Sequence, residues 1–93
     1  MKIELHTRLV QALEVLSAEL DDEMVMMSLE GNVFIKLDAI SKSIWTRLQT
    51  PATAADLCDA LVAEFDVSLA TCQQDVLRLL NQLHGQRLLR ITG

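Results

Sequence analysis

The segment GNVFIKLDAISKSIW, which spans Gly31–Trp45, decides the fold that we predict for this chain. It opens on a glycine-asparagine turn signal, continues through the apolar run Val33–Leu37, and then passes Asp38 into a helical pattern. Its neighbourhood in the sequence contains no acid–base pair, metal cluster or phosphate-binding loop. A short apolar strand that leads directly into a helix therefore indicates a recognition module rather than an enzyme.

Turn signals on either side of the preceding segment predict an antiparallel hairpin. Asp21–Asp22 and Glu30–Asn32 lie about ten residues apart, a spacing typical of a meander of short strands. The apolar segment Glu23–Leu29 lies between them. Side chains alternate along a strand, so Val33–Leu37 presents two faces. One face carries Val33, Ile35 and Leu37, and the other carries Phe34 and Lys36.

The segment before this hairpin is ambiguous. Leucines recur at helical spacing over Arg8–Leu20, which favours a helix. A lone two-stranded hairpin is marginally stable in water, however, and a third strand would stabilise it. We therefore predict a first strand over Glu14–Leu20, with a helix as the alternative. Residues 1–12 are expected to form a frayed or variable N-terminus.

Three helices are predicted after the hairpin. Asp38 is the expected N-cap of the first, Thr53 with Asp56 forms a capping box at the second, and Ser68 caps the third, which ends at Gly85. Each helix carries an apolar stripe. The three stripes are Ile40, Ile44, Trp45 and Leu48; Leu57, Cys58, Leu61, Val62 and Phe65; and Leu69, Cys72, Val76, Leu80 and Leu83. The predicted fold class is α+β, a three-stranded antiparallel sheet packed on three helices in the manner of a winged helix-turn-helix.

The composition indicates one folded domain over residues 1–93. Apolar residues make up 51% of the chain and charged residues 23%, which argues against disorder. The net charge of −5 repels nucleic acid and anionic membranes. No apolar run approaches the ~20 residues that span a bilayer, and the N-terminus has no signal peptide. We expect a cytoplasmic protein that binds neither membranes nor nucleic acid.

Because the predicted fold resembles a winged helix, DNA binding is one of the functions considered. The acidic charge of the predicted second and third helices argues against it. In such folds the third helix enters the major groove. Residues 52–83 carry five acidic side chains and one basic side chain, Arg78, so a recognition helix here would attract phosphates weakly. DNA binding is therefore the least favoured of the functions considered.

The residue types that support catalysis or metal binding are scarce and scattered. His6 and His84 have no cysteine or carboxylate at ligand spacing, so both are expected on the surface. Cys58 and Cys72 lie at apolar helical positions, where cysteine acts as a small buried hydrophobe. We therefore expect no catalytic residue, no metal site and no cofactor.

The strand Val33–Leu37 is the remaining candidate site. An exposed strand edge is covered, blunted by charge, or used to pair with another chain. Lys36 is the only charged residue between Glu30 and Asp38, so the charge protection of this edge is light. Two alternatives stay open: the C-terminal segment Leu88–Ile91 or the helices cover this edge, or a second copy of the chain pairs with it in a homodimer.

An ordered set of motifs runs from about residue 13 to residue 91. Its positions are Gly31, Leu37, Asp38, Trp45, Thr53, Leu57, Phe65, Asp66, Val67, Leu83 and Leu88. In this order they resemble the PqqD-like family, small proteins that recognise the leader region of ribosomally made precursor peptides. The chain departs from that pattern in its leucine-rich N-terminus and in Val33, where the family often has an aromatic residue.

The resemblance implies a non-catalytic protein to whose third strand a leader peptide adds as a further strand. It also implies that the leader lies in a groove against the third helix. One shoulder of that helix is the expected wall, and the other, with Leu77 and Asn81, is the alternative. The expected peptide-binding residues are Asn32, Val33, Phe34, Ile35, Lys36, Leu37, Asp75, Arg78, Leu79 and Gln82. Ile35→Pro is expected to abolish binding because proline removes a strand donor.

The partners implied by the resemblance are a precursor peptide and an enzyme that processes it. The segment Pro51–Cys58 is most like the discrete leader-binding partners of lasso-peptide proteases, which favours a leader protease. The alternative is a peptide chaperone of the pyrroloquinoline quinone type, working beside a radical SAM enzyme. A monomer or weak dimer is expected.

Overall fold

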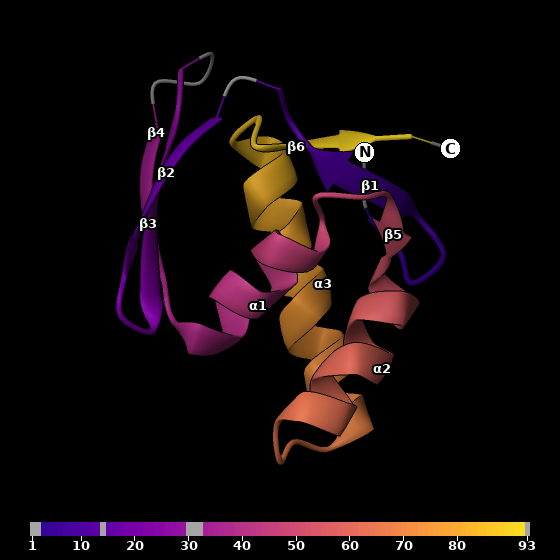
Figure 1. The fold of residues 1–93 in the computed structure, drawn as a ribbon. Coiled ribbons are helices and arrows are strands. Elements are labelled where there is room, and N and C mark those ends of the chain that lie inside the picture. Colours follow the sequence, from indigo (N-terminus) through magenta and orange to yellow (C-terminus); the bar gives the residue numbers. More distant parts are fainter. Residues whose placement is uncertain (1–2, 14, 30–32, 93) are drawn as a thin grey trace.

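The computed structural model describes residues 3–13, 15–29 and 33–92. Two three-stranded antiparallel sheets and three helices make up these residues (Figure 1). The strands are β1 (Arg8–Gln11), β2 (Val15–Leu20), β3 (Glu23–Ser28), β4 (Val33–Leu37), β5 (Ala52–Thr53) and β6 (Leu89–Ile91). The helices are α1 (Ala39–Arg47), α2 (Ala54–Glu64) and α3 (Leu69–Gly85). The predicted α+β class is confirmed, whereas the second sheet was not predicted and the likeness to a winged helix is not confirmed.

The first sheet has the order β2-β3-β4 and contains the hairpin that the turn signals predicted. The first strand is also confirmed over Val15–Leu20, so the helical alternative is wrong, while Glu14 lies outside the described residues. All six residues of β2 pair with β3. Asp21, with a φ of 55°, has the positive φ that the first residue of a tight hairpin turn requires. Pairing with β3 thus outweighs the helical spacing of the leucines.

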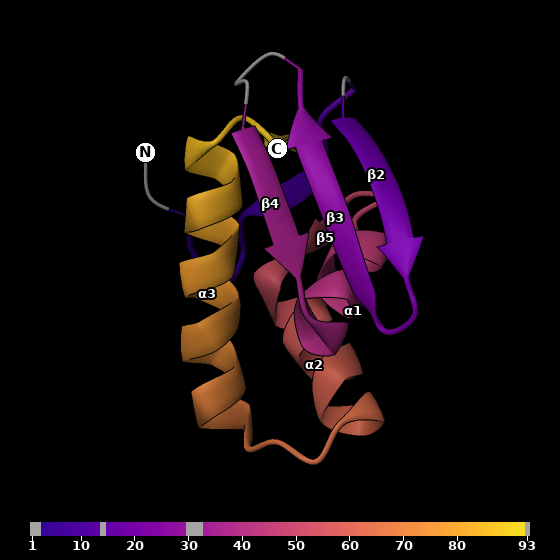
Figure 2. The same cartoon turned by 90° about the vertical axis from the view of Figure 1, so that its left-hand side faces the viewer.

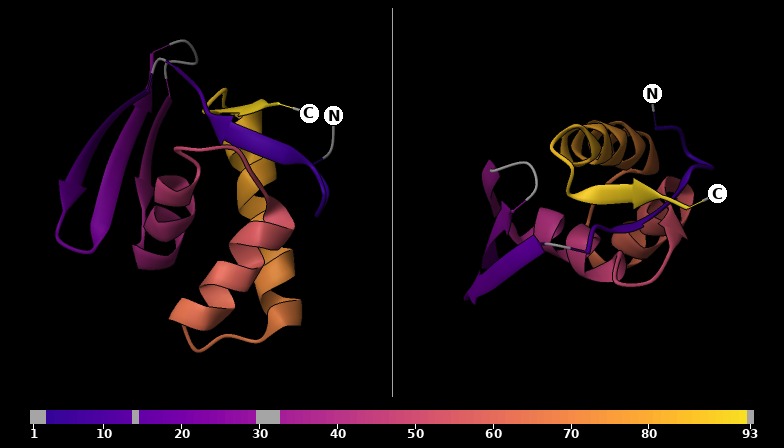
Figure 3. Two further views of the ribbon diagram at one scale, coloured as in Figure 1. Left: turned by 45° about the vertical axis from the view of Figure 1, so that its right-hand side comes forward. Right: turned by 90° about the horizontal axis from the view of Figure 1, so that it is seen from above.

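The second sheet has the order β5-β1-β6 and joins the two ends of the chain. It corrects the expectation of a frayed N-terminus, because Ile3 and Leu9 are fully buried. The backbone N–H of Ile3 donates to Asn81 Oδ1 at 2.9 Å, and Thr92 N–H donates to the carbonyl of Arg8 at 2.9 Å. The missed strand β1 pairs with β5 and β6, both far away in the sequence. Figure 3 shows this sheet apart from β2-β3-β4.

The predicted helix caps are confirmed. Asp38 Oδ1 accepts the N–H of Ser41 at 2.9 Å, which starts α1 directly after β4. Thr53 and Asp56 form the reciprocal capping box of α2, with both hydrogen bonds at 3.1 Å. The hydrogen bond from the Thr53 backbone N–H, which favours the charged carboxylate, lowers the pKa of Asp56. Ser68 caps α3.

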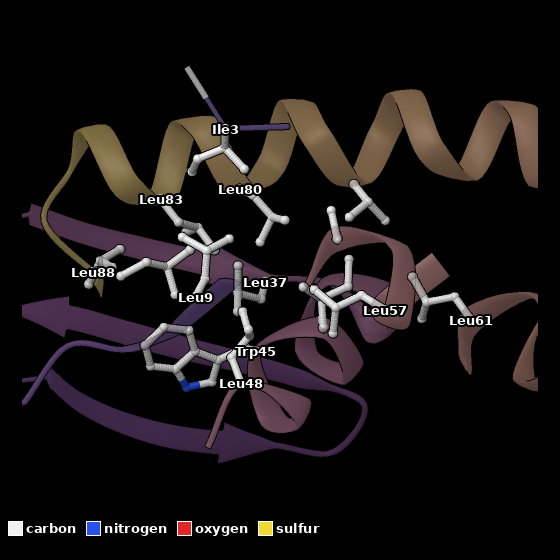
Figure 4. Packing of buried hydrophobic residues seen from close by; sticks show 14 of the residues in the cluster. Ile3, Leu9, Leu37, Trp45, Leu48, Leu57, Leu61, Leu80, Leu83 and Leu88 are labelled. Atoms are coloured by element: carbon white, nitrogen blue, oxygen red, sulfur yellow. The ribbon is translucent and has the colours of Figure 1, made fainter. Parts of the chain in front are cut away.

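The apolar stripes of the helices pack into one hydrophobic core (Figure 4). Leu80 and Leu83 of α3 face Trp45 and the aliphatic residues of the core in this view. Three residues of the predicted stripes are exceptions, because they lie at the ends or margins of their helices. These are Ile40, Val62 and Leu69, with exposed fractions of 39%, 39% and 47%.

Both cysteines are buried and unoxidised, as their apolar positions predicted. Burial raises the pKa of the Cys58 thiol to about 12, with the neighbouring Cys72 as a further cause. A protonated, buried thiol is a poor nucleophile. These residues therefore serve the packing of α2 against α3.

Candidate peptide-binding site

The strand β4 lies at an edge of its sheet. Among the described strands it pairs with β3 alone, over the five pairs from Ser28–Val33 to Met24–Leu37. The C-terminal strand β6 pairs with β1 instead, so the alternative in which it covers this sheet is wrong. In Figure 2, which looks onto this sheet from the side opposite the helices, β4 is the strand next to α3.

The two-residue turn between β2 and β3 determines which residues of β3 direct their backbone N–H and C=O groups toward β2 and which direct them toward β4. Leu20 lies opposite Glu23 directly at the turn, and such a turn closes on a hydrogen-bonded pair. Hydrogen-bonded and non-hydrogen-bonded pairs then alternate along the ladder. Glu23, Val25 and Met27 therefore direct their N–H and C=O groups toward β2, and the residues between them direct theirs toward β4.

The same alternation defines the outer edge of β4. Ile35 lies opposite Met26, so its N–H and C=O groups point to β3. Phe34 and Lys36 lie between the hydrogen-bonded positions, and their N–H and C=O groups point away from the sheet. Each of these two residues thus offers one donor and one acceptor to an incoming strand.

The side chains of β4 divide between its faces as the alternation predicted. Leu37 is buried and Ile35 is half-buried, both packed against the core. Phe34 is 70% exposed on the opposite face, and Lys36 Nζ lies 3.3 Å from Glu23 Oε2. Asn32 and the side chain of Val33 lie outside what the structure describes.

A cavity of about 270 Å³ lies where β4 ends and the chain enters α1. All four predicted α3 residues line it: Asp75, Arg78, Leu79 and Gln82. The structure therefore brings this shoulder of α3 together with Asp38 and the start of α1, directly after β4, whereas the described lining includes none of the predicted β4 residues. Sequence reasoning missed the rest of the lining, which includes Ile40, Ile44 and Phe65. The apolar stripes predict those residues as part of the core, because helical periodicity does not distinguish a buried contact from a cavity wall.

The opposite shoulder of α3 is occupied by the chain itself. Asn81 Oδ1 accepts the N–H of Ile3, and Asn81 Nδ2 donates to the carbonyl of Leu77 at 2.8 Å. The N-terminal segment thus lies against Asn81 on this shoulder. This contact occupies Asn81 on the alternative shoulder, while the shoulder with Leu79 lines the cavity.

The charged side chains at the cavity, two carboxylates and one guanidinium, are each held by a partner within the chain. Arg78 donates to Asp75 Oδ1 at 2.7 Å, an exposed ion pair three residues apart on α3. Such exposed pairs contribute little to stability. The Asp38 carboxylate is held by the N–H of Ser41 at the start of α1. Because the remaining walls include Ile40, Ile44 and Leu79, the cavity suits an apolar side chain.

The described residues contain no group of three His, Cys, Asp or Glu side chains placed to hold a metal ion. Among those same residues no helix is long and apolar enough to cross a membrane.

The fold and the open β4 edge define a class of small α+β proteins that present a strand beside a helix. The sequence model of the family described as Coenzyme PQQ synthesis protein D (PqqD) matches residues 23–89. Two proteins named PqqA binding protein are similar, from Xanthomonas euvesicatoria pv. vesicatoria (strain 85-10) and Xanthomonas axonopodis pv. citri (strain 306). Each is 33% identical over 70 residues, or 75% of this chain and 74% of the relative. The chain belongs to the PqqD-like family.

A solved structure extends this similarity to three dimensions. It is described as TbiB1 in complex with the TbiA(β) leader peptide, and it is 31% identical to this chain. The similarity covers 87% of this chain and 94% of TbiB1, with a TM-score of 0.78. It therefore includes most of the chain beyond the residues that the family model matches.

Proposed function

We propose that this protein binds the leader region of a ribosomally synthesised precursor peptide by adding it as a strand to β4. The observation that carries the proposal is the outward pair of Phe34 and Lys36 backbone groups on β4, the strand of its sheet that lies next to α3 (Figure 2). The names of the similar proteins support it, since they describe PqqA binding and a leader-peptide complex. The protein itself has no catalytic part in this proposal, and it acts in the cytoplasm, where precursors are made.

Backbone pairing alone does not account for useful affinity. A net hydrogen bond contributes about 1 kcal/mol, and micromolar binding requires about −8 kcal/mol. Side chains of the leader supply the remainder. Every second side chain of an added strand points to the inner side of the sheet, toward α3. An apolar residue there would enter the cavity beside Leu79 and contribute about 1.5–3 kcal/mol when fully buried.

The bound leader would be presented to an enzyme that processes the precursor. A leader protease is the favoured enzyme, because Pro51–Cys58 resembles the leader-binding partners of lasso-peptide proteases. The PqqD family match supports the second candidate, a radical SAM enzyme of the pyrroloquinoline quinone pathway. In both cases the recognition chemistry at β4 is the same.

The register of β4 makes Lys36→Pro a better test of strand addition than Ile35→Pro. Ile35→Pro, the substitution expected from sequence to abolish binding, removes an N–H that bonds to β3 and so damages the sheet. Lys36→Pro instead removes an N–H that points outward, and proline is tolerated at sheet edges. Lys36→Ala is its matched control, because it loses the same side chain and keeps the N–H.

The measurement is calorimetric titration with synthetic peptides that tile the short reading frames beside the gene, with the TbiA(β) leader and PqqA as reference ligands. Wild type and Lys36→Ala should bind one peptide with similar Kd. Lys36→Pro should weaken that binding at least tenfold, while circular dichroism shows that the variant is folded. Unchanged affinity in a folded Lys36→Pro variant would refute strand addition.

A further inference from the structure

The outer face of the β2-β3-β4 sheet carries an apolar row in register across all three strands. Leu16 lies opposite Met27, and Met27 lies opposite Phe34. Their exposed fractions are 54%, 37% and 70%. On the inner face of the same sheet, Met26 and Leu37 are buried. Both faces of the sheet therefore carry apolar side chains, but only those of the inner face are buried.

No described helix or strand lies against this outer face. Figure 1 shows α1, α2 and α3 all on the opposite side of the sheet, and Figure 2 looks directly onto the open face. The charged pair on this face, Lys36 and Glu23, is mutually neutralised. Contiguous exposed apolar surface of this kind marks interaction sites in soluble proteins.

The size of the face argues against a second copy of this chain as its occupant. Three strands about 4.8 Å apart and about 20 Å long cover roughly 300 Å². A stable interface buries about 800 Å² on each partner. A stable dimer held by this face alone is thus disfavoured, whereas a transient contact between a peptide carrier and its enzyme requires less area, under about 600 Å² on each partner.

A bound leader would enlarge this face. Phe34 directs its side chain to the outer face and its backbone N–H and C=O to the open edge. A strand added at that edge places every second side chain beside Phe34 on the same face. The sheet grows from three strands to four, and the surface of the loaded protein differs from that of the empty one.

We propose that this outer face, widened by the leader strand, docks the enzyme that processes the precursor. The inference rests on the proposed leader binding and adds the surface that recruits the partner. The partner is a globular protein with an apolar patch that contacts Leu16, Met27 and Phe34 together with the outward side chains of the leader. A basic rim on the partner would complement the exposed Asp21–Asp22 turn at one end of the face.

The test uses the double variant Leu16→Thr/Met27→Thr, which removes apolar surface and retains β-compatible residues. Leu16 lies on β2 and Met27 on β3, and neither strand is the proposed edge strand β4, so the backbone pairing of the leader with β4 is preserved. Leu69→Gln is the matched control, because Leu69 is 47% exposed at the start of α3, away from this face. Each protein is mixed with the precursor and with the purified protease or radical SAM enzyme encoded beside the gene.

The double variant should bind the leader with a Kd within twofold of wild type, yet support precursor processing at least tenfold more slowly. Biolayer interferometry should show that the leader strengthens wild-type binding to the enzyme at least tenfold, and the double variant should lose this gain. Leu69→Gln should match wild type in every measurement.

Normal leader binding with undiminished processing by the double variant would overturn the docking proposal alone. Failure of wild type to bind any leader would overturn the proposed function and, with it, this inference. Sedimentation velocity tests the rival occupant. A wild-type dimer that the double variant abolishes would assign the face to a second copy and overturn the docking of an enzyme.

Discussion

The two sheets of this protein contain three strands each but differ in what their edges do. In β5-β1-β6 the edge strands have two and three residues, and the central strand buries Leu9 completely. In β2-β3-β4 the edge strands β2 and β4 have six and five residues, and β4 ends beside a cavity. Short edge strands are protected from further pairing, whereas a longer edge is able to accept another chain. One sheet thus closes the fold, and the other presents a binding edge.

The strongest test of this contrast compares one leucine from each sheet. Leu9→Ala in β1 should reduce the free energy of unfolding by about 2–5 kcal/mol, because it removes a fully buried side chain. Leu16→Ala in β2 should change it by about 0.5 kcal/mol or less, since Leu16 is 54% exposed. Urea unfolding followed by circular dichroism measures both. Equal losses would show that the outer face of the β2-β3-β4 sheet is buried like the core, contrary to the 54% exposure of Leu16.

A second comparison concerns the two shoulders of α3. Leu79→Ala removes a wall of the cavity and should weaken leader binding about tenfold, a loss of about 1.4 kcal/mol. Leu77→Ala is the control on the same helix, and it should leave the Kd within about twofold because its shoulder contacts the N-terminal segment. Calorimetric titration measures the Kd of the leader for both variants. A larger effect from Leu77→Ala would place the leader on the opposite shoulder.

The smallest expected effect concerns pH and the contact between α1 and α2. Glu64 Oε2 accepts hydrogen bonds from Arg47 Nη2 at 2.8 Å and from Ser43 Oγ at 2.9 Å, and these bonds lower its pKa. The unfolded chain therefore binds the proton more tightly than the folded one. This contribution to stability is present above the ordinary glutamate pKa and is lost as the pH falls through the lowered value.

Glu64→Gln should flatten this acid dependence slightly, while leader affinity at neutral pH stays unchanged. Thermal unfolding midpoints measured between neutral and acidic pH for wild type and variant would show the difference. A variant with the same acid dependence as wild type would mean that this carboxylate does not contribute to it.

Local chemistry made much of the fold predictable. The caps at Asp38, Thr53 and Ser68 depend on contacts three residues apart, so short sequence patterns identify them. The β2–β3–β4 meander was predictable from its turns and alternation. β1 was missed because its partners, β5 and β6, lie about 40 and 80 residues further along the chain, and no local pattern records such pairing.

The candidate site divides in the same way. By itself the sequence determined that β4 is a strand with Phe34 and Lys36 on one face, since side chains alternate along any strand. Only the tertiary structure decided that the backbone groups of these two residues face outward, because this depends on the register set at the Asp21–Asp22 turn. It also decided which shoulder of α3 lines the cavity, because Asn81 on the other shoulder is held by Ile3, 78 residues away in the chain.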